Sequence, residues 1–144
     1  MSQSQSSQAY GSTQKLGAEA RQTEARALLE AARRMAEAQK KSDDREGYRA
    51  ALRLNWRLWT IIQSDIVSAE NVLPAEIKAN IMSLSVFIDK HTVGALADPD
   101  VVKMNVLIEI NRNIASGLMA TPAQESLSPS QSAGQSAAGG NVLA

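Results

Sequence analysis

The stretch that decides the fold is LNWRLWTIIQSDI, residues 54–66. The chain is only 3% aromatic, yet this apolar stretch holds both of its tryptophans, Trp56 and Trp59. Drawn as a helix with the turns before it, the stretch places two sets of apolar residues on adjoining sectors. One set is Tyr48, Leu52, Trp56, Trp59, Ile62 and Ile66, and the other is Leu54, Leu58 and Ile61. A helix packed by one neighbour needs an apolar arc of only about 100°, so this wider arc predicts a helix covered from two directions.

Helical periodicity continues on both sides of this segment, and no strand pattern competes with it. We expect a first helix from about Ala18 to Lys41 and a second from Ser42 or Asp43 to about Ala69. A third begins at Pro74 and ends near Gly94, where a left-handed cap is often needed. A fourth is capped by Asp98, has Pro99 at its first position and ends near Gly117. Short connections between four helices predict an all-α, antiparallel four-helix bundle over residues 18–120.

The two ends of the sequence differ from this middle part in composition. Residues 1–17 are rich in Ser and Gln, and residues 121–144 are rich in Ser, Ala, Gly and Gln. Such segments bury too little apolar surface to offset the entropy lost on ordering. We therefore predict disordered N-terminal and C-terminal tails.

Composition limits the remaining possibilities. The chain has no cysteine, which excludes disulfides and thiolate chemistry and fits a reducing compartment. The polar start has no signal-peptide pattern, and every apolar run is far shorter than a membrane helix of about 20 residues. Residues 1–57 carry 11 basic and 7 acidic side chains, whereas the remainder carries 4 and 8. The first half of the chain is therefore mildly basic. We expect a cytoplasmic protein that does not enter the membrane, and we expect it to be a monomer or a weak oligomer.

No pattern of catalytic residues is present. The single histidine, His91, lies on an apolar stripe, where a histidine is usually a hydrogen-bonded packing residue. No phosphate loop, nucleophile elbow, dinucleotide fingerprint or cluster at metal-ligand spacing occurs. We predict that the protein is not an enzyme and has no catalytic residue, metal site or cofactor.

Two features of the second helix suggest binding. Arg45, Arg49, Arg53 and Arg57 follow one another at intervals of four, and such a ridge is either a solvated face or a site for RNA phosphates. The wide apolar arc is either covered by the chain's own helices or leaves a groove for an amphipathic helix of a partner. Tryptophan and arginine often dominate interface energies. The candidate partner-binding residues are Trp56, Trp59, Arg57, Arg53, Ile62 and Asn55.

Four asparagines stand at otherwise apolar positions: Asn55, Asn80, Asn105 and Asn111. A buried amide without a partner costs about 1–3 kcal/mol. These residues therefore predict either mutual or backbone hydrogen bonds, or an exposed polar seam. One of them could also supply hydrogen bonds to a bound peptide.

Several short segments of the sequence together resemble the FlaF family of flagellar biosynthesis proteins from alphaproteobacteria. They are TEARALLEAARR, ALRLNWRLWTIIQSDI, LPAEIKANIMSLSVFIDKHT and ADPD followed by LIEINRNIASGL, and they cover roughly residues 20–120 in order. The matched positions are Asn55, Leu58, Trp59, Thr60, Asp65, Leu73, Pro74, Asn80, Leu84, Ser85, Ile110, Asn111, Asn113, Ile114 and Gly117. Trp56 is not among the matched positions, because only Trp59 belongs to the segment LWTI that carries the resemblance.

The resemblance implies a small, helical, cytoplasmic protein that is required for flagellin production and acts with its counterpart FlbT. FlaF-like proteins are associated with control of flagellin synthesis and with chaperoning flagellin before export. Our leading hypothesis is a flagellin chaperone and regulator whose groove is formed by the second helix, with Trp59, Ile62 and Arg57 at its edge. The alternative is a post-transcriptional regulator that acts on flagellin mRNA, directly through the arginines or through FlbT. A self-associating helical bundle is a third possibility.

Overall fold

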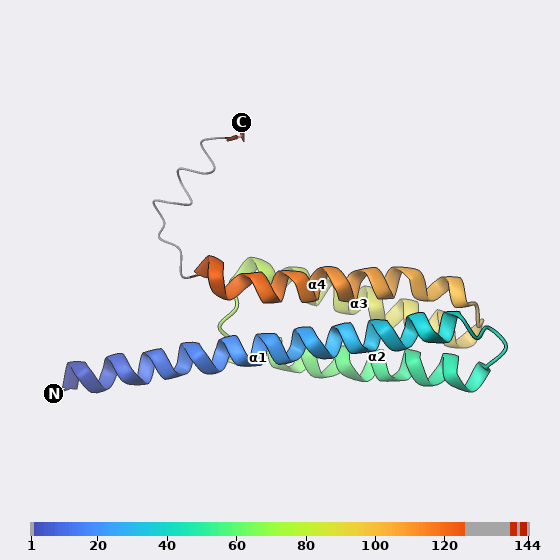
Figure 1. Ribbon diagram of the computed structural model, residues 1–144, viewed down its shortest axis with the longest axis horizontal. Coiled ribbons are helices and arrows are strands. Elements are labelled where there is room, and N and C mark those ends of the chain that lie inside the picture. The colour runs from blue at the N-terminus through green and yellow to red at the C-terminus, as the bar shows by residue number, and fades with distance from the viewer. Residues whose placement is uncertain (1, 126–138, 141, 144) are drawn as a thin grey trace.

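The computed structural model describes the backbone of residues 2–125, 139–140 and 142–143, and the side chains of residues 17–120. Its helices are α1 (Ser2–Gln39), α2 (Arg45–Ile66), α3 (Ala75–Ala97), the 3-10 turn η1 (Val101–Lys103) and α4 (Met104–Glu125). Two short strands, β1 (Gly139–Gly140) and β2 (Val142–Leu143), pair antiparallel. The prediction of an all-α fold with four helices is confirmed. Consecutive helices run in opposite directions along one long axis (Figure 1).

Several predicted helix boundaries are wrong. α1 begins at Ser2 instead of near Ala18, because Ser, Gln and Ala tolerate a helix that the packed turns have already nucleated. The flexibility of residues 1–17 stays a prediction. α4 continues past Gly117 to Glu125. Of the predicted C-terminal tail, residues 126–138, 141 and 144 lie outside the described residues.

The helix caps also differ from the predicted ones. Asp44, not Ser42 or Asp43, caps α2, and its Oδ1 accepts a hydrogen bond from the Gly47 amide at 3.0 Å. Asp100 caps η1 in the same way through Val102. Asp98 instead ends α3, which runs through Gly94 to Ala97. Neighbouring acidic residues are equally suitable as helix caps. Which of them caps the helix therefore depends on how tertiary contacts position the connection.

The core is a continuous column of apolar side chains between the helices. α1 contributes mainly small residues, with Ala25, Ala31, Ala32 and Ala38 all buried. They let α1 pack closely and extensively against α4, and it also packs against α2. α2 packs in turn against α3, whereas few backbone positions of α3 and α4 come close together. The largest buried side chains are Trp59, Leu28, Met35, Leu52, Ile62, Ile81, Ile88, Met104 and Leu107.

A hydrogen-bonded polar cluster lies inside this core. Trp59 Nε1 donates to Asn111 Oδ1 at 2.9 Å. The amide nitrogen of Asn111 is 2.7 Å from Asn55 Oδ1 and 3.1 Å from the carbonyl oxygen of Leu28. The cluster therefore joins α1, α2 and α4 in one register. Asn55 Nδ2 is the only amide group of the cluster without a hydrogen-bond partner among the described residues.

The asparagines thus satisfy both alternatives that the sequence left open. Asn55 and Asn111 are buried and bond to each other, whereas Asn80 and Asn105 are exposed. Asn105 Oδ1 accepts a hydrogen bond from Gln39 Nε2 at 2.6 Å, which ties the end of α1 to the start of α4. Asn80 faces a groove that is described below.

Replacing Asn111 tests the polar cluster. We expect Asn111→Ala to lower the free energy of unfolding by about 2–6 kcal/mol, because it leaves the buried polar groups of Trp59 and Asn55 unpaired at about 1–3 kcal/mol each. Urea unfolding followed by circular dichroism measures the change. The matched control is Asn113→Ala on the exposed side of the same helix, which should change stability by less than about 0.5 kcal/mol. Equal stability of the two variants would contradict this role of Asn111.

Candidate functional site

The structure separates the predicted partner-binding residues into two groups. Trp59, Ile62 and Asn55 are buried, at 0%, 2% and 0% exposure. The expectation that Trp59 and Ile62 form the edge of a groove is therefore wrong. They occupy the middle of the apolar arc, which α1 and α3 cover from two sides while Trp59 reaches α4 across the core. The surplus apolar sector is the one around Ile61, which is 58% exposed.

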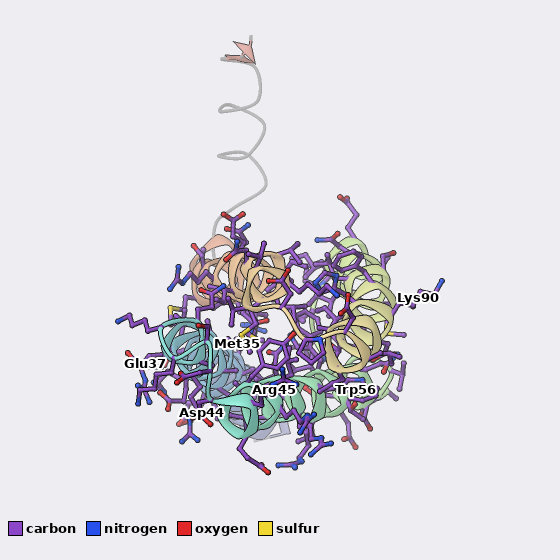
Figure 2. The ribbon with its side chains drawn as sticks, turned by 90° about the vertical axis from the view of Figure 1, so that its right-hand side faces the viewer. Met35, Glu37, Asp44, Arg45, Trp56 and Lys90 are labelled. Atoms are coloured by element: carbon purple, nitrogen blue, oxygen red, sulfur yellow. The ribbon has the colours of Figure 1, made fainter. Side chains whose placement is uncertain are left out.

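Trp56, Arg53 and Arg57 lie nearer the surface. The two arginines are exposed, and Trp56 is half-buried at the boundary between α2 and α3 (Figure 2). Its Nε1 donates to Asp89 Oδ1 at 2.9 Å. This contact gives Trp56 a structural role in holding α3 against α2, whereas partner binding by these three residues stays a prediction.

The best candidate for a binding groove lies between α3 and α4, whose backbones come close at only a few positions. It has a volume of about 330 Å³. The side chains that line it come from the first half of α3 and the second half of α4, and none is charged. They are Ile77, Asn80, Ile81, Asn113, Ile114, Gly117, Leu118 and Ala120.

The floor and the rims of this groove differ in character. Ile81 and Leu118 are buried at its base, and Ile77 and Ile114 are half-buried beside them. Asn80 and Asn113 are exposed, one on each helix. At Gly117 an added Cβ would meet no atom within 4 Å, so the helix backbone there is open to a close approach. The groove thus offers an apolar surface flanked by two amide groups.

The apolar side of α3 continues beyond the groove toward the α3–α4 connection. Leu84, Phe87 and His91 follow Asn80 at helical spacing, and Phe87 is 42% exposed. The rings of Phe87 and His91 are stacked with centroids 5.3 Å apart. His91 Nε2 lies 2.6 Å from the carbonyl oxygen of Lys103 and must donate, because a carbonyl can only accept. His91 is therefore the predicted packing residue, and its hydrogen bond closes this end of the seam.

Sequence patterns alone missed the groove, although its residues were visible as parts of other patterns. Ile77, Ile81 and Leu84 belong to the apolar stripe of α3, and Ile114 and Leu118 to that of α4. Helical periodicity predicts which residues face inward, but the separation of α3 from α4 depends on how the other helices pack. The one local signal is the pair Asn80 and Asn113, which are polar residues on the edges of apolar stripes.

A model described as "Flagellar protein FlaF" matches residues 6–118 of this chain, which include most of each of the four helices and every residue that lines the α3–α4 groove except Ala120. The chain belongs to the FlaF family. Comparisons with curated proteins and with solved structures found no match. The resemblance noted in the sequence is thereby confirmed. Of the positions that carried it, Asn80, Leu84, Ile110, Asn113, Ile114 and Gly117 lie on or near the facing sides of α3 and α4.

The described part of this FlaF-family protein was predicted to have neither a metal site nor a membrane-spanning segment. Within the described residues, no group of three or more His, Cys, Asp or Glu side chains could hold a metal ion. Among the described helices, none combines the length and the apolar character needed to cross a membrane.

A pair of carboxyl groups joins α1 to the end of α2, on the side of the bundle where α2 leads into α3. The pKa of Glu24 is raised from 4.5 to about 8, mainly by burial and in addition by a hydrogen bond to Asp65 and by the negative charge of Asp65. Arg21 lowers it by a smaller amount. The amide nitrogen of Asn71 also approaches Asp65 Oδ2, at 3.5 Å. At neutral pH Glu24 therefore holds a proton that it donates to Asp65.

This shared proton predicts a pH dependence of stability. Below about pH 4.5 both the folded and the unfolded chain hold the proton on Glu24, but between pH 4.5 and about 8 only the folded chain does. Rising pH then favours the unfolded chain. We expect the melting temperature to fall between pH 5 and pH 8, and Glu24→Gln to reduce that fall. Glu19→Gln, an exposed position on α1, should keep the wild-type profile. A Glu24→Gln profile that parallels the wild type would contradict the shared proton.

Proposed function

We propose that this protein binds flagellin as a cytoplasmic, non-enzymatic chaperone and thereby promotes or regulates flagellin synthesis and secretion. The observation that carries the proposal is the uncharged apolar groove between α3 and α4 in a chain of a flagellar protein family. Flagellin ends are amphipathic segments, whose apolar stripes would promote association if they were left uncovered in the cytoplasm. An apolar groove between two helices is the usual receptor for one such stripe.

The apolar side of α3 that begins in the groove is long enough to contact a helical segment. From Ile77 to His91 it is about 21 Å long at 1.5 Å per residue. A bound helix of similar length would lie beside α3 and α4 and bury Phe87, which is 42% exposed without a partner. Asn80 and Asn113 could hydrogen-bond polar groups at the border of the apolar stripe. These groups would set the register of the bound helix while the floor supplies most of the apolar contact.

The alternative, regulation of flagellin mRNA directly or through FlbT, rests on the arginines of α2. Those residues are on the surface, which the alternative requires. RNA recognition usually adds aromatic rings on which bases stack. Trp56 is half-buried and its N–H is engaged by Asp89. Flagellin binding through the groove is therefore the better supported function.

Isothermal titration calorimetry with purified flagellin, and with a peptide of either terminus, tests the proposal. Calorimetry is preferable to tryptophan fluorescence because neither Trp56 nor Trp59 lines the groove. We expect binding at tens of micromolar or tighter. Gly117→Glu should weaken it at least about tenfold, since a charged side chain would enter an apolar surface and remain unpaired there. Because the site of this Cβ is open, the fold should persist.

The matched control places the same charge on the next face of α4. Ser116→Glu adds a carboxylate one residue earlier, at an exposed position that does not line the groove. Flagellin affinity should then stay within about twofold of the wild type. Absence of any binding heat with flagellin and both peptides would refute the proposed function. Equal losses in the two variants would show that flagellin binds elsewhere.

A further inference from the structure

A second surface of the protein carries a row of arginines that form no ion pair with any of the described side chains. Arg45, Arg49, Arg53 and Arg57 follow one another along α2, and all are exposed except the half-buried Arg49. Residues four apart on a helix are separated by about 6 Å, so the four residues form a row about 18 Å long. We call this the basic row.

The basic row differs from Arg33 and Arg34 of α1, which are paired with an acidic side chain. On α1, Arg33 Nη2 and Arg34 Nε contact Glu30 Oε2 at 2.7 and 3.0 Å. Among the side chains of residues 17–120, none forms an ion pair or hydrogen bond with a guanidinium group of the basic row. Like charges four residues apart destabilise a helix. The bundle thus keeps an unfavourable arrangement on α2 although it pairs similar charges on α1.

Apolar side chains border the basic row on the neighbouring helix. Asp89 of α3 contacts Trp56, which lies between Arg53 and Arg57 in the sequence. Val86 and Val93 lie about one turn before and one turn after Asp89 and are 49% and 53% exposed. The surface at the α2–α3 boundary therefore combines a line of positive charge with an adjoining apolar strip.

We propose that the basic row and this valine strip together dock an acidic, amphipathic helical segment of a protein partner. Carboxylates at intervals of four on one face of such a helix would match the spacing of the arginines, and apolar residues on the next face would cover the valines. Charge complementarity of this kind increases the rate and the specificity of association. A nucleic acid would also meet the arginines, but Val86 and Val93 offer its bases no aromatic ring on which to stack. The surface lies on the opposite side of α3 from the flagellin groove, so this proposal is independent of the proposed function.

The probe is a synthetic helical peptide of about 20 residues, long enough to form a helix in water. It carries Glu at every fourth position on one face and Leu on the adjoining face, and a scrambled peptide of the same composition serves as the reference. Fluorescence anisotropy measures binding to the full chain. Affinity should exceed that of the scrambled peptide and should fall steeply as salt is raised from about 50 to 500 mM.

Two charge-matched variants locate the binding site. Arg49→Gln/Arg53→Gln/Arg57→Gln should weaken peptide binding at least about tenfold. Arg26→Gln/Arg33→Gln/Arg34→Gln removes the same number of charges from exposed positions on α1 and should change affinity by no more than about twofold. Circular dichroism and melting curves verify that both variants fold. Equal weakening by the two variants, or no preference for the designed peptide over the scrambled one, would overturn the proposal.

Two further measurements separate a protein segment from other occupants. Val86→Ser/Val93→Ser keeps every charge and should weaken peptide binding several-fold, while binding of a mixed-sequence single-stranded RNA should not change. Tighter binding of that RNA than of the peptide would replace the proposal with a nucleic-acid site. A dimer in sedimentation that dissociates when the basic row is changed to Gln would instead assign the surface to a second copy of the chain.

Discussion

The amide of Asn111 is the interaction on which the arrangement of the bundle depends. This buried side chain accepts a hydrogen bond from Trp59 Nε1 through its oxygen. Its nitrogen donates to Asn55 Oδ1 and to the carbonyl oxygen of Leu28. Shifting any of α1, α2 or α4 by one residue would break these bonds and leave polar groups in an apolar core. The cluster therefore specifies the register of three helices, whereas apolar packing alone would tolerate several. α3 contributes nothing to it.

The different attachment of α3 explains why the groove is where it is. Tyr48 donates its hydroxyl hydrogen to the carbonyl oxygen of Ala95 and accepts from the amide of Asp100. These hydrogen bonds of Tyr48, together with those of His91 to Lys103 and of Trp56 to Asp89, hold the second half of α3 in the bundle. Among the described side chains, none hydrogen-bonds from the first half of α3 to α4. That half is held by packing alone, so the seam beside Ile77 and Ile81 is where the bundle can open at least cost.

Much of the fold could be predicted from the sequence because it depends on local periodicity. The apolar stripes identify the four helices, and the width of the arc around Trp59 correctly indicates a helix covered from two sides. The caps were harder to predict, because Asp43 and Asp44, or Asp98 and Asp100, are equally suitable by residue type. The groove could not be predicted, since it depends on the distance between α3 and α4. That distance follows from the small alanines of α1, which draw α4 toward α1 and away from α3.

The two proposed binding surfaces share α3, which gives this helix a central position in any coupling between them. Its α4 side borders the groove, and its α2 side carries Asp89, Val86 and Val93 next to the basic row. A helix inserted beside Ile77 and Ile81 would press on the half of α3 that is held only by packing. Any resulting rotation of α3 would move Val86 and Val93 relative to the arginines of α2, while the bond from Trp56 to Asp89 would resist it. Because the surfaces lie on different sides of the helix, two partners can bind together without overlapping, and the affinity of one can depend on the other only through the position of α3.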